Sequence, residues 1–284
     1  MTEQDKLWNY SNPAETEIKF REALQSISPE KNLSVYLQLQ TQIARTYSLR
    51  MMFDEAHKTL EEVEKLLPAE NEVAHVRYHL ECGRTFNSSG KIMEAKAAFE
   101  KAEQIAIQLQ EDAYTVDALH MLAIIAPQDE TASINERAII FAEESKQENA
   151  KGWLGSLYNN LGWCYFDKGE YEKALSIFLR ALKWREDKKS LPEIFIAKWC
   201  VAKTLRALNR LNEALKIQLA LLEEMISNNS PDGYVYEEIA EIYHTRNEEV
   251  QKMYFGFAYK ELSQDKWLAK NEPARLERLK KLSA

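Results

Sequence analysis

Six small residues recur along this chain at an almost constant spacing of 39, 40, 39, 40 and 38 residues. In five of the six cases a large side chain follows three positions later, one helical turn on. Small residues let two packed helices approach closely, and the large neighbour fills the volume beside the crossing. A regular period of this length predicts an all-α solenoid of about six antiparallel helix pairs, each buried against its neighbours. The small residues are Ala44, Gly83, Ala123, Gly162, Ala202 and Ala240.

One pair is visible in full between Tyr158 and Glu186. Two apolar stretches with helical period flank the turn sequence Asp-Lys-Gly-Glu, whose glycine is Gly169. Glycine suits such a turn because it adopts positive φ angles without strain. The apolar positions are Tyr158, Leu161, Gly162 and Tyr165 before the turn, and Tyr171, Ala174, Phe178 and Ala181 after it.

These residues resemble the tetratricopeptide signature W-x2-L-G-x2-Y followed by A-x3-F, with Tyr158 in the tryptophan position and Glu186 where a proline usually stands. The resemblance extends over roughly Val35 to Ser263, and several stretches are similar to stand-alone bacterial proteins of this fold with no assigned activity. It implies a right-handed superhelix that has no catalytic activity. It also implies that the chain binds a peptide or protein segment in a concave groove lined by the first helix of each pair.

The ends of the chain are expected to cap this array. Asn12-Pro13-Ala14-Glu15 is a helix start, because asparagine caps well and proline suits the first helical position. We expect an N-terminal capping helix over 12–30, six helix-pair repeats over 33–264 and a C-terminal capping helix over 272–284, all in one domain spanning 1–284. The expected apolar positions of the end helices are Ile18, Phe20, Ala23, Leu24 and Ile27, and Leu276, Leu279 and Leu282.

Two repeats depart from the pattern. In the third, Pro127 is expected to end the first helix, because the residue before a proline is pushed out of the helical region. In the sixth, the register shifts after Asn247, and its second half is apolar enough to face inward. We expect Tyr254, Phe257 and Ala258 to make the inward contacts.

If the resemblance holds, the groove residues lie at fixed offsets from each small residue. This surface is richer in cations than the acidic chain as a whole, which favours an anionic ligand such as an acidic segment or a C-terminal carboxylate. Tryptophans in the middle would add aromatic anchors. The alternative is that the arginines simply pair with acids of the neighbouring repeat. The candidate ligand-binding residues are Arg45, Arg84, Asn87, His120, Asn159, Trp163, Trp199, Lys203 and Arg206.

The composition of the chain argues against several classes of function and indicates a location. A net charge of -8 argues against general nucleic-acid or anionic-membrane binding, and no apolar run is long enough to span a membrane. Three scattered cysteines indicate a reducing compartment, so a cytoplasmic location is expected.

Ser88-Ser89-Gly90-Lys91 lacks the spacing of a phosphate loop, and His75 with His79 lacks further metal ligands. We therefore expect no cofactor, no metal and no enzymatic activity.

Two functional hypotheses follow from these observations. The first is a scaffold or adaptor that holds a protein or peptide partner in the groove, with the partner's identity and the oligomeric state left open. The alternative is a peptide-sensing signalling receptor whose superhelix closes on a short peptide.

Overall fold

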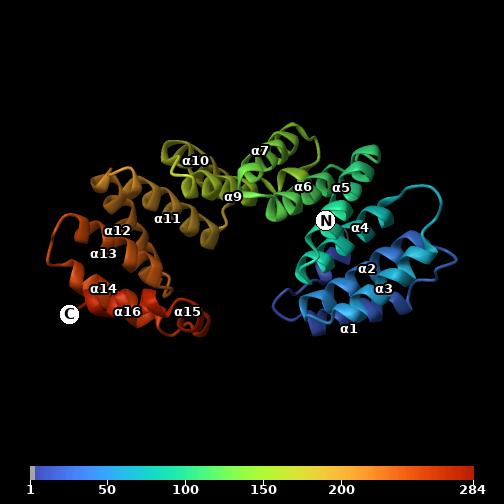
Figure 1. The fold of residues 1–284 in the computed structure, drawn as a ribbon, viewed down its shortest axis with the longest axis horizontal. Coiled ribbons are helices and arrows are strands. Elements are labelled where there is room, and N and C mark those ends of the chain that lie inside the picture. The colour runs from blue at the N-terminus through green and yellow to red at the C-terminus, as the bar shows by residue number, and fades with distance from the viewer. Residues whose placement is uncertain (1–3) are drawn as a thin grey trace. The chain divides into compact units, whose positions relative to one another are not determined.

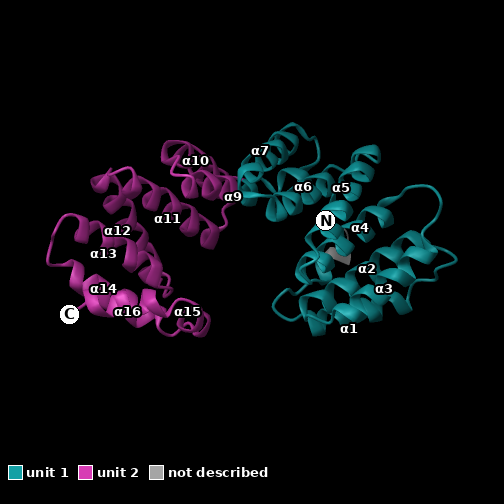
Figure 2. Ribbon diagram, viewed as in Figure 1, with its two compact units in different colours: residues 1–157 teal, residues 158–284 magenta. Residues whose placement is uncertain are grey.

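The structure is a computed structural model that describes residues 4–284, and it contains helices and no strand in that range. The chain forms two compact units, residues 1–157 and 158–284, which are described separately (Figure 2). Among the described helices, none is both long and apolar enough to cross a membrane. The single domain that the sequence predicts over 1–284 stays a prediction.

The first unit consists of three helix pairs with short helices at its ends. Each α-helix packs against the next, α2 also contacts α4, and α1 packs on α2 (Figure 1). The elements are η1 (Gln4–Leu7), α1 (Pro13–Gln25), α2 (Leu33–Leu49), α3 (Phe53–Leu66), α4 (Val73–Ser88), α5 (Ile92–Gln108), α6 (Asp112–Ile125), α7 (Gln128–Glu144), α8 (Glu148–Lys151) and the start of α9 (Leu154–Asp167).

The second unit continues from within α9 and repeats the same plan. From α10 to α14 each helix packs against the next, and α16 packs against α14 and α15 (Figure 1). Together the two units contain the six helix pairs that the sequence predicts. The elements after α9 are α10 (Tyr171–Lys188), α11 (Leu191–Ala207), α12 (Leu211–Ser227), α13 (Gly233–Thr245), α14 (Gln251–Leu262), α15 (Lys266–Asn271) and α16 (Pro273–Leu282).

The small residues lie where paired helices come closest, as the spacing predicts. A Cβ atom added to Gly83 would lie 2.4 Å from Cε1 of Phe99, and one added to Gly162 would lie 2.4 Å from Cε1 of Phe178. These are the same contact in two different units. The alanines at the equivalent positions are buried, at 0–3% exposure. The forty-residue period is therefore a period of helix crossings.

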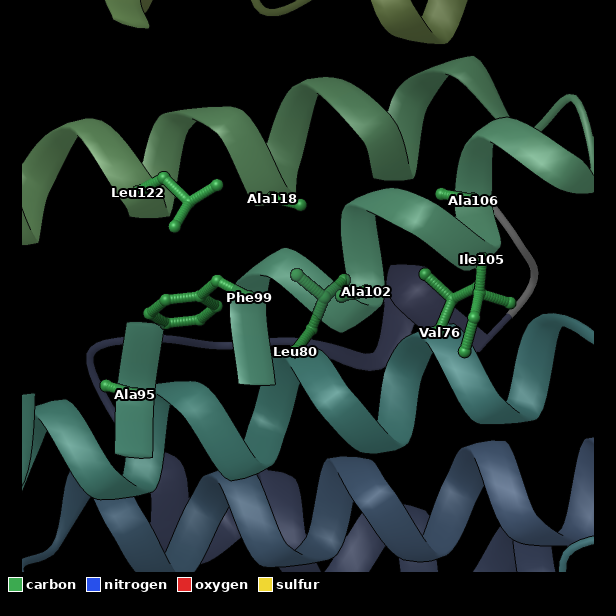
Figure 3. Close-up of a cluster of buried hydrophobic side chains, with 9 residues drawn as sticks. All are labelled: Val76, Leu80, Ala95, Phe99, Ala102, Ile105, Ala106, Ala118 and Leu122. Atoms are coloured by element: carbon green, nitrogen blue, oxygen red, sulfur yellow. The ribbon is translucent and has the colours of Figure 1, made fainter. Parts of the chain in front are cut away.

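The core between α4, α5 and α6 shows what this spacing achieves. Figure 3 shows side chains of α5 lying between those of α4 and those of α6. Phe99 and Ala102 have no exposed surface, and Leu80 and Ile105 are 1% exposed. One face of α5 thus buries residues against both neighbours, so a pair gains its core only when the next pair is present.

The turn inside most pairs has a fixed geometry. After α2, the N–H of Met51 donates to the carbonyl of Ser48, and the N–H of Met52 donates to the carbonyl of Tyr47, both at 3.0 Å. This pattern closes a helix with a residue at positive φ. In these five turns, the large residue three positions after the small one therefore accepts the closing hydrogen bond. The positive-φ residues of these turns are Met51, Gly90, Gly169, Asn209 and Asn247.

The structure shows several local contacts at the ends and in the irregular repeats, and it corrects two expectations. The side chain of Asn12 accepts from the N–H of Glu15, Pro127 directly precedes α7, and Leu279 is fully buried. Of the expected apolar positions of α1, Ile18 does not face the core, because its side chain is 58% exposed, whereas Phe20 is buried. In α14 the buried ring is that of Phe255 and not that of Phe257. The side chain of Phe257 is 42% exposed, and its ring contacts that of Tyr236.

Candidate ligand-binding site

A pocket of about 740 Å³ lies in the first unit. Its walls come from the first helix of three successive pairs, α2, α4 and α6, and from the residues that precede α1. Residues of α8 and the start of α9 close the far side. This is the side of each pair that the sequence resemblance assigns to the groove.

Four charged side chains form a connected network in the floor of this pocket. Arg84 donates to Glu81 at 2.7 Å and to Oδ2 of Asp117 at 2.6 Å, so it joins α4 to α6. Arg45 of α2 reaches the same Glu81 from the other side, at 3.8 Å. Glu81 is 3% exposed and Asp117 is 8% exposed, so both carboxylates are held away from water.

The two arginines of this network are unequally satisfied. Burial alone would lower the pKa of Arg84, but the carboxylates of Asp117 and Glu81 outweigh burial and raise it. The pKa of Arg45 is lowered, mainly by burial, with Glu81 opposing and the positive charge of Arg84 adding to the shift. A cation with one carboxylate at 3.8 Å has no full charge-assisted hydrogen bond, which requires a shorter contact. Arg45 is therefore the less satisfied cation in this floor.

Aromatic rings stand at the edges of the pocket. Trp8 and Tyr10 precede α1, and Trp153 precedes α9. The ring of His120 lies 5.3 Å from that of Trp153, and burial lowers the pKa of His120. Arg77 donates from Nε to the hydroxyl of Tyr114 at 2.7 Å. The pocket thus combines fixed charges in its floor with rings at its rim.

The remaining sequence-predicted cations lie in the second unit, and acids neutralise them. Lys203 donates to Oε1 of Glu238 at 2.6 Å, and Arg206 donates to Oε2 of the same carboxylate at 2.7 Å. Glu238 is 3% exposed, and despite its burial these two cations lower its pKa. The alternative that basic groove residues pair with acids of a neighbouring repeat therefore describes these contacts.

The other three candidates of the second unit, two tryptophans and an asparagine, make contacts with neighbouring side chains and backbone. The indole N–H of Trp199 donates to the carbonyl of Tyr234 at 3.2 Å, and the Trp199 ring lies 5.9 Å from that of Trp163. The side chain of Asn159 lies 3.9 Å from Sγ of Cys200. These contacts leave the ligand-binding role of the three residues a prediction.

Of the nine candidates, Arg45 and Arg84 line the pocket, and His120 touches its rim through Trp153. Asn87 is half-buried near the end of α4 and does not line the pocket. Asn159, Trp163, Trp199, Lys203 and Arg206 lie in the second unit. A ligand-binding role stays a prediction for each of them.

The acids that pair with the candidate cations were not predicted from the sequence. Glu81 and Glu238 both stand two residues before a small residue, and the first also stands three before Arg84. An acid two residues before the small residue is therefore a pattern that the sequence contains. For Glu81, the i,i+3 spacing to Arg84 also indicates an ion pair on one helix face. Trp8 and Tyr10 precede the repeats, and the repeat spacing gives no indication of them.

No group of three or more His, Cys, Asp or Glu side chains in the described part of the chain is placed to hold a metal ion. His75 instead caps α4, since its Nε2 lies 3.1 Å from the carbonyl of Pro68 and its Nδ1 accepts from the N–H of Glu72. Gly90 has a φ of +80° and forms the turn after α4.

Residues 155–188 match the family model for the tetratricopeptide repeat. A search of curated proteins finds no match. Among solved structures, the apo form of RapI aligns with a TM-score of 0.74 at 14% identity, covering 93% of this chain and 76% of RapI.

Two further structures extend this comparison. A signal transduction ATPase with a tetratricopeptide repeat sensor from Pyrococcus horikoshii aligns with a TM-score of 0.72 at 16% identity, over 96% of this chain and 42% of that one. The apo form of the quorum sensor NprR from B. thuringiensis aligns with a TM-score of 0.51 at 13% identity, over 97% of this chain and 83% of that one. The protein therefore has the tetratricopeptide-repeat fold, and residues 155–188 are one such repeat.

Proposed function

We propose that this chain is a non-catalytic interaction protein that binds a peptide or protein segment in the pocket of its first unit. The observation that carries the proposal is that pocket of about 740 Å³, walled by the first helices of three successive pairs. Its volume suits a few amino-acid residues of a partner. A carboxylate of the bound segment is held by Arg45.

The state of Arg45 supports an anionic group in the ligand. Its guanidinium is largely buried and has one carboxylate at 3.8 Å, while the neighbouring Arg84 repels it. A ligand carboxylate at hydrogen-bond distance would replace the water that Arg45 has lost. Each charge-assisted hydrogen bond nets roughly 1.5–3 kcal/mol. Two such bonds would therefore contribute roughly 3–6 kcal/mol to binding.

The acids of the pocket favour a single anion over an acidic run. Glu81 and Asp117 already occupy Arg84, and the carboxyl groups of Glu111 and Glu148 line the same pocket. A segment with several carboxylates would meet these four acids as like charges. A C-terminal carboxylate brings one anion on a flexible end, and it therefore fits this pocket better than an acidic segment does.

Affinity selection tests this proposal directly. The purified chain is mixed with synthetic N-acetylated octapeptides of random sequence, in one pool with free carboxyl termini and one pool with amidated termini. Captured peptides are identified by mass spectrometry. We expect enrichment from the free pool and little from the amidated pool, because only the former offers a terminal anion.

Two variants assign the effect to the pocket. Arg45→Gln removes the cation at similar size and should abolish the enrichment. Arg137→Gln is the matched control, since this arginine lies on α7 outside the pocket lining with its side chain 60% exposed. Circular dichroism confirms the fold of both. Equal capture from the two pools by the unmodified chain would overturn the proposal without reference to any variant.

A peptide-sensing receptor is the second candidate. The alignments to RapI and to the quorum sensor NprR, over 93% and 97% of this chain, favour it. Such a receptor would change its dimensions on binding, whereas a simple scaffold would hold its partner without compaction. Small-angle scattering with and without an enriched peptide separates the two, because a smaller radius of gyration is expected for the receptor alone.

A further inference from the structure

Tyr10 presents an exposed aromatic ring to the pocket of the first unit. It lines the pocket although 67% of its surface is exposed. One face of the ring is covered by Trp8, with ring centroids 4.6 Å apart and an interplanar angle of 3°. Since a parallel stack covers one face only, the exposed surface of Tyr10 includes its other face.

The indole of Trp8, on which the ring of Tyr10 stacks, is itself fixed by two contacts. The indole N–H of Trp8 donates to Oε1 of Gln42 on α2 at 2.9 Å. The indole also packs against the buried ring of Phe20, with ring centroids 5.3 Å apart and an interplanar angle of 74°. A large ring that is fixed by a hydrogen bond and a buried neighbour does not lose rotamer freedom when a ligand arrives. The stack is therefore preorganised.

The backbone around Tyr10 is fixed as well. The N–H of Asn9 donates to Oγ1 of Thr16 at 3.0 Å, and that hydroxyl donates back to the carbonyl of Asn9 at 3.1 Å. The N–H of Ser11 donates to the side chain of Asn9 at 3.1 Å, and the N–H of Asn12 donates to the carbonyl of Asn9 at 3.0 Å. The segment between Trp8 and α1 thus holds an aromatic ring open at the pocket rim.

Tyr10 and Arg45 line the same pocket. Glu81, Arg84 and Asp117 influence the pKa of both side chains. A ligand that fills this pocket can therefore meet the guanidinium of Arg45 and the ring of Tyr10 together. A single C-terminal amino acid with a planar side chain offers both groups a few bonds apart.

We propose that the pocket selects peptides whose last residue is aromatic, with the terminal carboxylate on Arg45 and the ring stacked on the open face of Tyr10. This inference rests on the proposed peptide-binding function and adds its specificity. Stacked aromatic pairs are favoured over contacts with aliphatic side chains of similar area. We expect Phe, Tyr and Trp to exceed Leu and Ile at the last position by roughly three- to tenfold.

The free-carboxyl selection described above measures this preference, with residue frequencies read at the last position. The unmodified chain should show the aromatic excess. Tyr10→Ala should reduce aromatic residues to the level of Leu, and Tyr10→Phe should retain the excess because it keeps the ring. Ile18→Ala, an exposed change on α1 outside the pocket lining, is the matched control and should behave as the unmodified chain.

The outcomes separate the two proposals. Enrichment that depends on Arg45 but shows no aromatic excess would overturn this inference and leave the proposed function standing. An excess of arginine at positions near the end would also overturn it, because the open ring would then receive a guanidinium group. No enrichment from the free-carboxyl pool would overturn both. The composition selected by the unmodified chain decides the question even if Tyr10→Ala fails to fold.

Discussion

Met51 adopts a backbone conformation that glycine adopts at the same place in other repeats. Its φ is +60°, while Gly90 and Gly169 have φ of +80° and +74° in the equivalent turns. A residue with a Cβ atom loses about 1–2 kcal/mol in this region. Gln110 and Lys189 are in the same situation after second helices, with φ of +56° and +58°. These side chains carry strain that the repeat geometry imposes.

Met51→Gly should therefore stabilise the protein. The relief of the left-handed strain exceeds the entropic cost of glycine, and we expect a gain of about 0.5–1 kcal/mol in the free energy of unfolding. Urea denaturation measures it. Met93→Gly is the matched control, because Met93 is equally exposed but helical, and this variant should lose up to about 1 kcal/mol. A loss at Met51 would show that its conformation carries no strain.

Gln218 is a fully buried amide in α12. Its side chain is 0% exposed, and neither its oxygen nor its nitrogen has a hydrogen-bond partner among the described residues. A buried polar group without a partner costs about 1–3 kcal/mol. We expect Gln218→Met, which has a similar shape, to raise the free energy of unfolding by about 1–2 kcal/mol in urea titrations. A decrease would mean that the amide has a partner in solution.

His79 makes the stability of the first unit depend on pH. Burial and the nearby charge of Lys101 lower its pKa to about 4, from an ordinary value of 6.5. Between these values the unfolded chain binds a proton that the folded chain does not bind. The free energy of unfolding should thus fall as the pH falls from about 6.5 to 4, with His79 contributing on the order of 1–3 kcal/mol.

Urea midpoints at pH 7 and pH 4.5 measure this contribution. His79→Gln cannot bind the proton, so its loss of stability between the two pH values should be smaller than that of the unmodified chain. His244→Gln, at an exposed histidine, should show the full loss. If His79→Gln and the unmodified chain lose the same stability, His79 titrates normally in the folded state.

At the scale of helices, a glycine at a helix crossing stabilises the packing, whereas a glycine elsewhere in a helix only lowers helix propensity. Gly83 lies against the buried ring of Phe99, where an added Cβ would come within 2.4 Å. Gly256 lies in α14, and an added Cβ would meet its nearest atom at 3.7 Å, an ordinary contact. The two positions share a helical backbone and differ in the space available.

Alanine substitution at these two positions should change stability with opposite sign. Gly83→Ala forces the close-packed ring to move, and overpacking of about 1–3 kcal/mol exceeds the gain in helix propensity. Gly256→Ala has only the gain, up to about 1 kcal/mol. Thermal unfolding of both variants measures the difference. Stabilisation by Gly83→Ala would show that α4 and α5 separate easily, which contradicts the crossing geometry.

Local features of the helices were predictable, and contacts between distant helices were less so. The small residues, the turn glycines and the helix end before Pro127 follow from constraints that act within a few residues. The buried Phe255, in contrast to the expected Phe257, depends on where α14 sets its register after the turn at Asn247. The basic groove was predicted from one helix at a time, whereas Glu81 and Asp117 neutralise Arg84 from two helices.

At the scale of the molecule, the stability of one unit should depend little on a core defect in the other. Repeat arrays are stabilised by contacts between neighbours, so a local defect weakens adjacent repeats most. Phe99→Ala removes a fully buried ring and should cost about 3–5 kcal/mol in its surroundings. Hydrogen exchange followed by mass spectrometry should show the largest loss of protection in α4, α5 and α6. The loss should be small beyond residue 158.

The same experiment informs the single-domain prediction. A loss of protection that declines with distance along the repeats is expected from nearest-neighbour coupling. An equal loss across residues 4–284 would show that both units unfold as one cooperative body, and that coupling within the array is stronger than neighbour contacts provide.

The binding of a terminal carboxylate to Arg45 is tested most directly by NMR of the arginine side chains. The Nε–Hε signals are recorded while the most enriched free-carboxyl peptide is added, and again with its amidated form. We expect the signal of Arg45 to shift with the free peptide and to stay in place with the amide, while Arg206, paired with Glu238, does not respond. A shift at Arg206 without one at Arg45, or equal shifts with both peptides, would contradict the account.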